Sequence, residues 1–143
     1  MNVIENSIVL QRPVEDVFAY INQFSNDVYW RKGVTSMTQS TPVTQVGTTT
    51  HELLSFMGTA YDTLGEVIEV VPNAKTAYRS TQSKVGVTAW RRVEAADGGT
   101  LTTMHTEVDI QGLMALFAPV MAAVFSRQMR ADLLTLKRLL ESR

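Results

Sequence analysis

Residues 32 to 110 form an uninterrupted block of strand-like segments, and one long helical pattern follows it. Glycines, prolines and an Asp-Gly-Gly turn divide the block, and strands joined by short turns favour antiparallel pairing. The expected strands are roughly Val34–Thr41, Thr48–Phe56, Thr59–Val71, Ala74–Thr81, Val85–Ala95 and Leu101–Ile110. Such a sheet has one face to bury, and only the C-terminal helix is long enough to cover it.

The flanking segments complete the order of elements. Val3–Leu10 is predicted to be a first strand, and two short helices follow, one opening at Pro13 and one covering Phe24–Trp30. In the C-terminal helix, apolar residues recur at spacings of three and four: Met121, Phe125, Met129, Leu133, Leu136 and Leu140. We therefore expect an α+β fold in which seven antiparallel strands curve around this helix.

The start of the long helix is unusually apolar. From Leu113 to Phe125 no side chain carries a charge or forms hydrogen bonds, and Pro119 either starts the regular helix or kinks it. This run of 13 residues is too short to cross a bilayer, which takes about 20 apolar residues. No integral membrane association is therefore expected.

Composition narrows the class of protein. A chain of 143 residues, 45% hydrophobic and 19% charged, is expected to be one globular domain over residues 1–143. The net charge of −1 argues against nucleic acid as the main partner. The N-terminus lacks the basic start and apolar run of a signal peptide, so we expect a cytoplasmic protein. The oligomeric state is not indicated.

Motifs for metals and cofactors are not found. There is no cysteine, and the two histidines, His51 and His105, fall on different strands without clustered carboxylates, so no metal site is predicted. No Gly-x-Ser-x-Gly elbow and no glycine-rich phosphate loop occurs, and no cofactor is predicted. The alternation of the last strand directs His105 toward solvent, whereas His51 either enters a cavity mouth or points outward.

Several segments resemble the SRPBCC superfamily, the START-like, polyketide cyclase/dehydrase and lipid-transport proteins. The matching segments span essentially the whole chain: RPVEDVFAYI, Trp30 at the end of the second short helix, VGTTTHE, GEVIEVVPNAKTAYRS, DGGTLTTMHTEVDIQG and RADLLTLKRLLESR. Pro13 followed by Glu15 is similar to the way the first helix of this family usually opens. The resemblance implies a helix-grip fold with a cavity between the sheet and the long helix, but fold alone does not assign chemistry.

Aromatic and methionine side chains are the candidates for lining such a cavity, because both adapt to apolar ligands. Arg91 lies on the apparent inner face of its strand, where a guanidinium needs a carboxylate or an acidic ligand group; the alternative is an exposed arginine on a bulged or edge strand. The predicted ligand-binding residues are Tyr29, Trp30, His51, Phe56, Tyr61, Arg91, Met104, Met114, Phe117 and Met121, and no catalytic residue is predicted.

The favoured function is binding of a hydrophobic or amphipathic small molecule, such as a lipid, polyketide-like or isoprenoid compound. One alternative is a cyclase or dehydratase that uses the same cavity, although no convincing acid–base pair is visible in the sequence. Another is a regulatory module that contacts a protein through the outer face of the sheet. In the helix-grip arrangement Leu113–Phe125 would lie at the cavity mouth and act as a gate, more mobile than Met129–Leu140.

Overall fold

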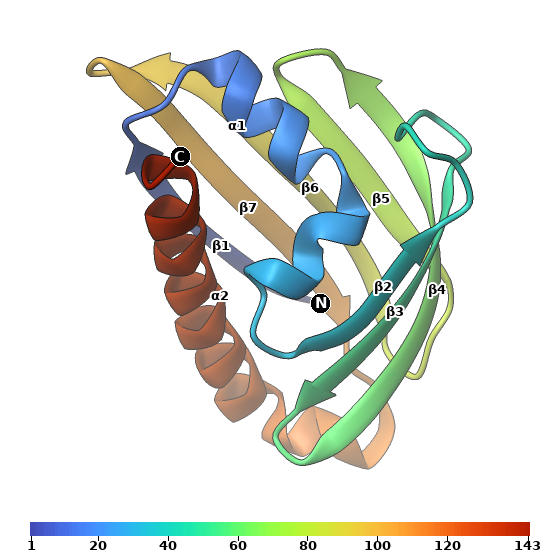
Figure 1. Ribbon diagram of the computed structural model, residues 1–143. Helices are drawn as coiled ribbons and strands as arrows, with labels where there is room; N and C mark the ends of the chain where they lie inside the picture. The colour runs from blue at the N-terminus through green and yellow to red at the C-terminus, as the bar shows by residue number, and fades with distance from the viewer.

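A computed structural model describes all residues from 1 to 143. It contains a single antiparallel sheet in the order β1-β7-β6-β5-β4-β3-β2, which curls around the long helix α2 (Figure 1). The strands are β1 (Asn2–Leu10), β2 (Val34–Gln39), β3 (Thr49–Phe56), β4 (Thr59–Val71), β5 (Lys75–Gln82), β6 (Gly86–Ala96) and β7 (Gly99–Asp109). The predicted α+β helix-grip fold with seven strands is confirmed.

Two short helices cross the concave face of the sheet between β1 and β2. They are α1 (Val14–Ile21) and the 3₁₀ helix η1 (Phe24–Tyr29), both drawn in blue in Figure 1. The inward face of α1 buries Val17, Phe18 and Ile21. The pair covers the upper half of the sheet, so any open space must lie in the lower half.

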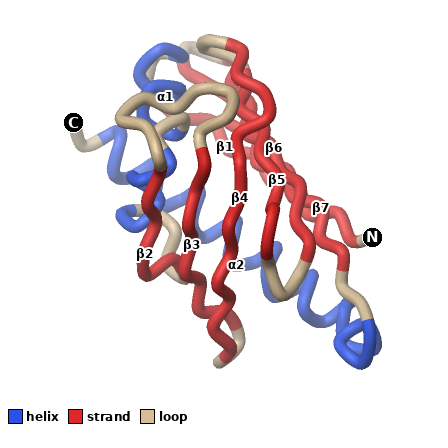
Figure 2. The backbone as a smooth tube through the Cα atoms, turned by 90° about the vertical axis from the view of Figure 1, so that its right-hand side faces the viewer, coloured by secondary structure: helices blue, strands red, loops and turns tan.

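Tight turns set the register of the sheet. Met57-Gly58 and Asp97-Gly98 adopt positive φ, as two-residue hairpin turns of the favoured twist require. They join β3 to β4 and β6 to β7. The last strand, β7, pairs with β1 along its whole length, from Asn2↔Val108 to Leu10↔Thr100. The strands then lie side by side, with α2 behind them in the side view (Figure 2).

Helix α2 (Ala118–Glu141) is preceded by a second 3₁₀ helix, η2 (Gly112–Phe117). Pro119 lies in the first turn of α2, so the proline starts the regular helix rather than kinking it. The second half of α2 packs on the sheet beside β1 and buries Leu133, Leu136 and Leu140. Each of these leucines contributes about 2 kcal/mol by leaving water.

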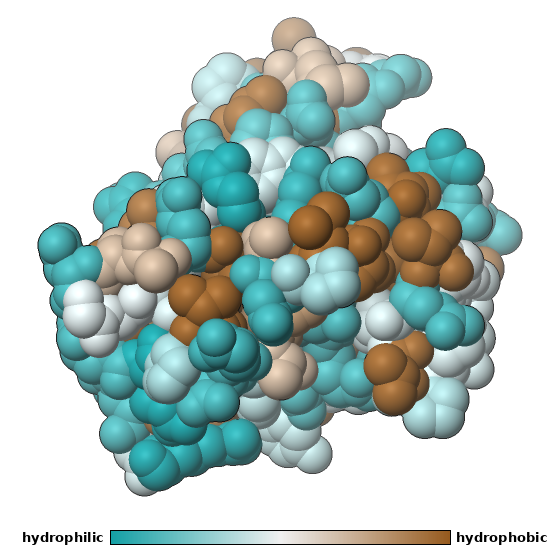
Figure 3. All heavy atoms as spheres, turned by 90° about the horizontal axis from the view of Figure 1, so that it is seen from above, coloured by the Kyte–Doolittle hydropathy of each residue, from teal (hydrophilic) through white to brown (hydrophobic).

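The C-terminal end of α2 is also held by polar contacts. The Glu141 carboxylate accepts the Gln11 backbone N–H at 2.8 Å, and the Arg12 guanidinium donates to the Leu140 carbonyl at 2.6 Å. At this upper end of the molecule hydrophobic and hydrophilic residues are interspersed on the surface (Figure 3). The lower end differs, because Leu113 and Leu116 of η2 remain 83% and 76% exposed.

Candidate functional site

A cavity of about 360 Å³ lies between the concave face of the sheet and the first half of α2. Eighteen of its 32 lining residues are hydrophobic. The hairpin end at Met57, the β5–β6 loop and the start of α2 border it at the lower end of the molecule, and η1 and the segment after it border it further inside. The volume falls within the usual range of small-molecule sites, about 300–1,000 Å³.

The apolar wall follows from strand alternation and helical spacing. The even-numbered side of β7 faces inward, so Met104, Val108 and the following Ile110 line the cavity. From the opposite side α2 contributes Met121 and Phe125. The cavity therefore offers methionine and branched side chains that adapt to irregular apolar shapes.

An aromatic contact closes the space between β3 and α2. The rings of Phe56 and Phe125 meet edge to face, with 5.6 Å between their centroids. Both residues line the cavity, and Phe56 lies directly before the β3–β4 turn. This contact and the hydrogen bonds from Asn6 of β1 to Ser126 hold the first half of α2 to the sheet, while its second half is anchored by the core.

Polar groups gather at the inner part of the cavity. Arg31, which follows η1, donates from Nη1 to Glu52 Oε2 at 2.7 Å and to Asp27 Oδ2 at 3.0 Å. Glu52 reaches this position because Thr50, Glu52 and Leu54 share the inward side of β3. Burial alone would lower the pKa of Arg31, but the charges of Glu52 and Asp27 outweigh that effect and raise it.

Asp132 of α2 is the third carboxylate near this point. Its Oδ1 accepts the Lys32 backbone N–H at 3.1 Å and the Gln128 side-chain amide at 2.8 Å. Burial raises the pKa of Asp132, and these two hydrogen bonds only partly offset the effect. The side chain borders the cavity, so a carboxyl with raised pKa is presented to any bound molecule.

Tyr78 of β5 completes the group that we call the polar cluster, defined as Arg31, Glu52, Tyr78 and Asp132. The Tyr78 ring packs edge to face on Phe24 at 5.0 Å and lines the cavity. Burial raises the pKa of Tyr78, although the nearby cations Arg91 and Arg31 oppose the shift. At neutral pH Tyr78 is therefore a neutral hydroxyl.

Arg91 points inward, as one of the two predicted arrangements has it, but its partner is a protein carboxylate. Nη1 bonds Asp27 Oδ1 at 3.0 Å and Nη2 bonds Asp27 Oδ2 at 2.5 Å, and both side chains are almost completely buried. Phe24, Trp30 and Tyr78 surround the guanidinium, with its Cζ 4.5, 5.3 and 5.8 Å from their ring centroids. Arg91 does not line the cavity, so no ligand group reaches it.

Four of the ten predicted ligand-binding residues border the cavity: Phe56, Tyr61, Met104 and Met121. The other six do not: Tyr29, Trp30, His51, Arg91, Met114 and Phe117. Tyr29 is 67% exposed on the outer side of η1, whereas Trp30 is buried in the core beside Arg91. His51 points outward and its Nε2 lies 2.6 Å from Asp62 Oδ1, because the inward positions of β3 are the even-numbered ones.

The segment η2 projects from the lower end, which explains why Met114 and Phe117 miss the cavity. Phe117 is 63% exposed and Met114 is half-buried. By length and average composition, Gly112–Glu141 would suffice to span a membrane. That criterion is weak evidence for a single helix, but burial in the core does not account for it here, because only 11% of the most apolar part of this stretch is buried, while the second half of α2 packs on the sheet.

The sequence interpretation missed Asp27, Arg31, Glu52, Tyr78 and Asp132. A local signal existed for one pair: Asp27 and Arg31 have the i, i+4 spacing of helical ion pairs, although here the helix is 3₁₀. The inward direction of Glu52 could be predicted only with the correct register of β3. Tyr78 and Asp132 carry no local signal, because their role comes from elements that meet in space.

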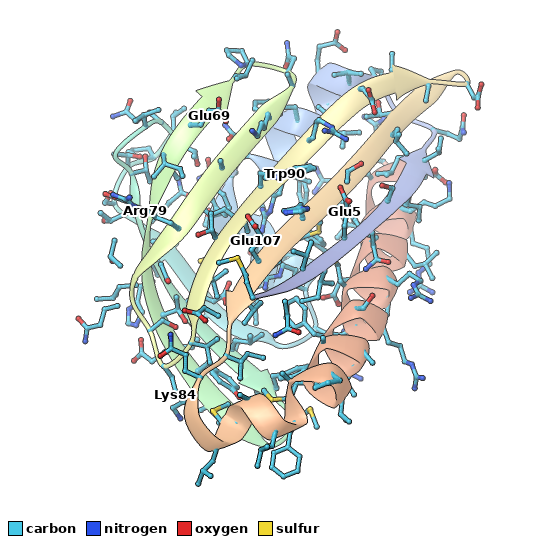
Figure 4. All side chains as sticks on the ribbon, turned by 180° about the vertical axis from the view of Figure 1, so that it is seen from behind. Glu5, Glu69, Arg79, Lys84, Trp90 and Glu107 are labelled. Atoms are coloured by element: carbon cyan, nitrogen blue, oxygen red, sulfur yellow. The ribbon has the colours of Figure 1, made fainter.

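The outer face of the sheet carries a separate group. His105 stacks flat on Trp90, with centroids 4.7 Å apart, and lies 3.8 Å from both Glu5 and Glu107. Figure 4 shows Trp90, Glu5 and Glu107 on this face. The predicted outward direction of His105 holds, but the side chain is covered by Trp90 and only 17% exposed. This group lies on the side of the sheet opposite to the cavity and does not take part in it.

The comparisons with known proteins agree with this architecture. Residues 1–141 match the family described as polyketide cyclase/dehydrase and lipid transport. No curated protein matches the chain significantly.

Solved structures with the same fold include protein TTHA0849 from Thermus thermophilus, with a TM-score of 0.86, 14% identity and coverage of 99% of this chain and 100% of that one. The ZhuI aromatase/cyclase from Streptomyces has a TM-score of 0.80 at 14% identity, covering 99% and 94%. The di-domain aromatase/cyclase StfQ of steffimycin biosynthesis has a TM-score of 0.81 at 17% identity, and the match covers 99% of this chain and 51% of StfQ. At such identities these similarities show the fold alone.

Proposed function

Because the chain belongs to the polyketide cyclase/dehydrase and lipid-transport family, we propose that it binds a hydrophobic or amphipathic small molecule in the cavity between the sheet and α2. The observation that carries the proposal is a largely apolar cavity of about 360 Å³ with one polar cluster at its inner part. A lipid, polyketide-like or isoprenoid compound has the matching distribution of apolar and polar atoms. The outer face of the sheet shows no feature that favours a regulatory partner over this ligand.

The expected affinity follows from burial. Each methylene transferred from water into the cavity stabilises the complex by about 0.8 kcal/mol, so a ten-carbon chain gains about 8 kcal/mol. Association costs at least about 4 kcal/mol in lost translational and rotational freedom. At most about 4 kcal/mol therefore remains, which corresponds to a dissociation constant of about a millimolar from apolar contact alone, and hydrogen bonds to the polar cluster strengthen it.

The test uses N-phenyl-1-naphthylamine, a neutral dye whose fluorescence rises in apolar surroundings. Titration of the purified protein should give a saturable increase with one dye per chain. Wild-type protein that leaves the dye fluorescence unchanged would contradict the proposed function.

Two neighbouring alanines of α2 provide a matched control. Ala122 lines the cavity, whereas Ala123 is exposed and faces away from it. Ala122→Trp should fill the cavity and weaken dye binding about tenfold or more, while Ala123→Trp should leave it nearly unchanged. Equal effects of the two substitutions would place the dye at another site.

A cyclase or dehydratase activity is the second candidate, and one observation favours it. The cavity presents a carboxyl with raised pKa, Asp132, together with the Tyr78 hydroxyl and the Arg31 guanidinium, which are groups suited to proton transfer and to binding a carbonyl oxygen. For an enzyme, Asp132→Asn would abolish turnover of a polyketide-like substrate while dye binding is retained. For a binding protein, no substrate of this class is converted by the wild type.

A further inference from the structure

We propose that the polar cluster selects a neutral ligand head group that both donates and accepts hydrogen bonds, such as a hydroxyl, and disfavours an anionic head group. The inference rests on the proposed ligand binding and specifies its chemistry. It is carried by the charges around the inner part of the cavity and by the hydrogen-bonding groups that remain unused there.

The charges leave no net positive charge for an anionic ligand. The two buried guanidiniums, Arg31 and Arg91, face three carboxylates. Those carboxylates are Asp27, Glu52 and Asp132. With Asp132 protonated the remaining charges still balance, and both Nη atoms of Arg91 are paired with Asp27. A ligand carboxylate would therefore lose its hydration and lie close to carboxylates of the same sign.

The hydrogen-bonding groups left unused in the polar cluster include both donors and an acceptor. Both protein hydrogen bonds of the Arg31 side chain use Nη1, so its Nη2 and Nε retain donor capacity. The bond from Arg31 reaches Glu52 at Oε2, which leaves Oε1 as a free acceptor. A ligand hydroxyl accepts from Arg31 and donates to Glu52, so it satisfies both groups without adding charge.

Other cations lie where an inward-pointing head group cannot meet them. Arg79 is among the residues that border the cavity, but its side chain is 58% exposed, is turned to the outer face and is paired with Glu66 at 2.6 Å (Figure 4). Lys84 lies at the lower end of the molecule, with its Nζ 5.4 Å from the centroid of the Tyr61 ring. A carboxylate could use Lys84 only with its tail directed inward, which is the opposite orientation.

The experiment compares decan-1-ol with decanoate as competitors for bound N-phenyl-1-naphthylamine at about pH 8, where the acid is ionised. An alcohol enters any apolar cavity more readily than a carboxylate, so the ratio of the two dissociation constants in wild type is only the reference. The informative quantity is the change of this ratio in variants.

Glu52→Gln keeps an acceptor for Arg31 and removes one negative charge. We expect it to lower the ratio of the decanoate to the decanol dissociation constant about tenfold, by improving decanoate binding. Glu66→Gln removes an outer-face carboxylate from the neighbouring strand and should change the ratio less than twofold. Lys84→Met should also leave the ratio within about twofold.

Two results would overturn the inference. If Glu52→Gln and Glu66→Gln change the ratio of the two dissociation constants equally, the polar cluster does not contact the head group. Loss of decanoate binding in Lys84→Met shows that the head group lies at the mouth. In both cases dye binding by the wild type still supports the proposed function, whereas protein that binds no dye rejects both.

Discussion

Arg91 of β6 and Asp27 of η1 form a two-pronged ion pair that is closed to solvent, with N–O distances of 3.0 and 2.5 Å. The pair ties the short helix to the middle of the sheet. Asp27 also accepts a bond from Arg31, so the same carboxylate orients the guanidinium that borders the cavity. The inner part of the site is therefore built on a structural ion pair that no ligand contacts.

Arg91→Met should destabilise the protein strongly, because it leaves the Asp27 carboxylate buried beside a single remaining cation. Removing one partner of a buried pair costs about 3–5 kcal/mol. Arg79→Met is the matched control, because Arg79 lies on the adjacent β5 and also pairs with a carboxylate, that of Glu66, but its side chain is 58% exposed. Its loss should cost under about 1 kcal/mol. Urea unfolding measures both, and similar costs would contradict the structural role of Arg91.

Gly99 at the start of β7 is expected to tolerate no side chain. A Cβ at this position would lie 2.1 Å from the Leu10 carbonyl oxygen, and that backbone is fixed by the β1–β7 pairing. Gly99→Ala should lower the free energy of unfolding by about 2 kcal/mol or more. In Gly86→Ala the nearest atom is 3.7 Å away, so this control should be tolerated. A neutral Gly99→Ala would show that the two strands separate easily.

Asp132 should make stability depend on pH. Burial raises its pKa above the ordinary 3.8. The protonated carboxyl therefore contributes fully to the free energy of unfolding at pH values below the pKa of the unfolded chain, and this contribution is lost as pH rises through the pKa of the folded protein. Asp132→Asn keeps the acceptor Oδ1 without the charge. We expect a higher Tm than wild type at about pH 7 and no advantage at about pH 3. The same gain at both pH values would contradict the assignment.

The first half of the long helix should open more readily than the second. Leu113 and Leu116 of the preceding η2 are exposed and Phe125 contacts the sheet through Phe56, whereas Leu133 and Leu136 are buried in the core. Amide hydrogen exchange should be at least about tenfold faster across residues 113–125 than across residues 129–140. Equal protection of the two halves would mean that the apolar segment is part of the core and not a gate.

The fold could be predicted from the sequence because turns and periodicity are local signals. Gly98 and the surrounding Asp97 and Gly99 marked the β6–β7 hairpin, and alternation along β7 placed Met104 inside. The first half of α2 was harder to interpret, because an apolar stretch has the same sequence pattern whether it is buried in a core or borders an open cavity.

The site could be predicted only in part, for a physical reason. Phe56 and Met121 border the cavity because apolar residues on inward faces are recognisable. The partner of Arg91 could not be predicted, because Asp27 lies 64 residues away in the sequence and meets Arg91 only after η1 folds over the sheet. His51 turned outward because one residue of register decides which face a strand residue occupies.

The seven methionines provide the most direct test of the central claim, that the cavity holds the ligand. Met37, Met57, Met104, Met121 and Met129 line the cavity, whereas Met1 and Met114 do not. In an NMR spectrum of methyl-labelled methionine, saturation with decan-1-ol should shift the signals of several of the first five, Met104 and Met121 above all, and leave that of Met1 unchanged. Saturable binding that shifts only Met1 or Met114, with Met104 and Met121 unmoved, would contradict the account.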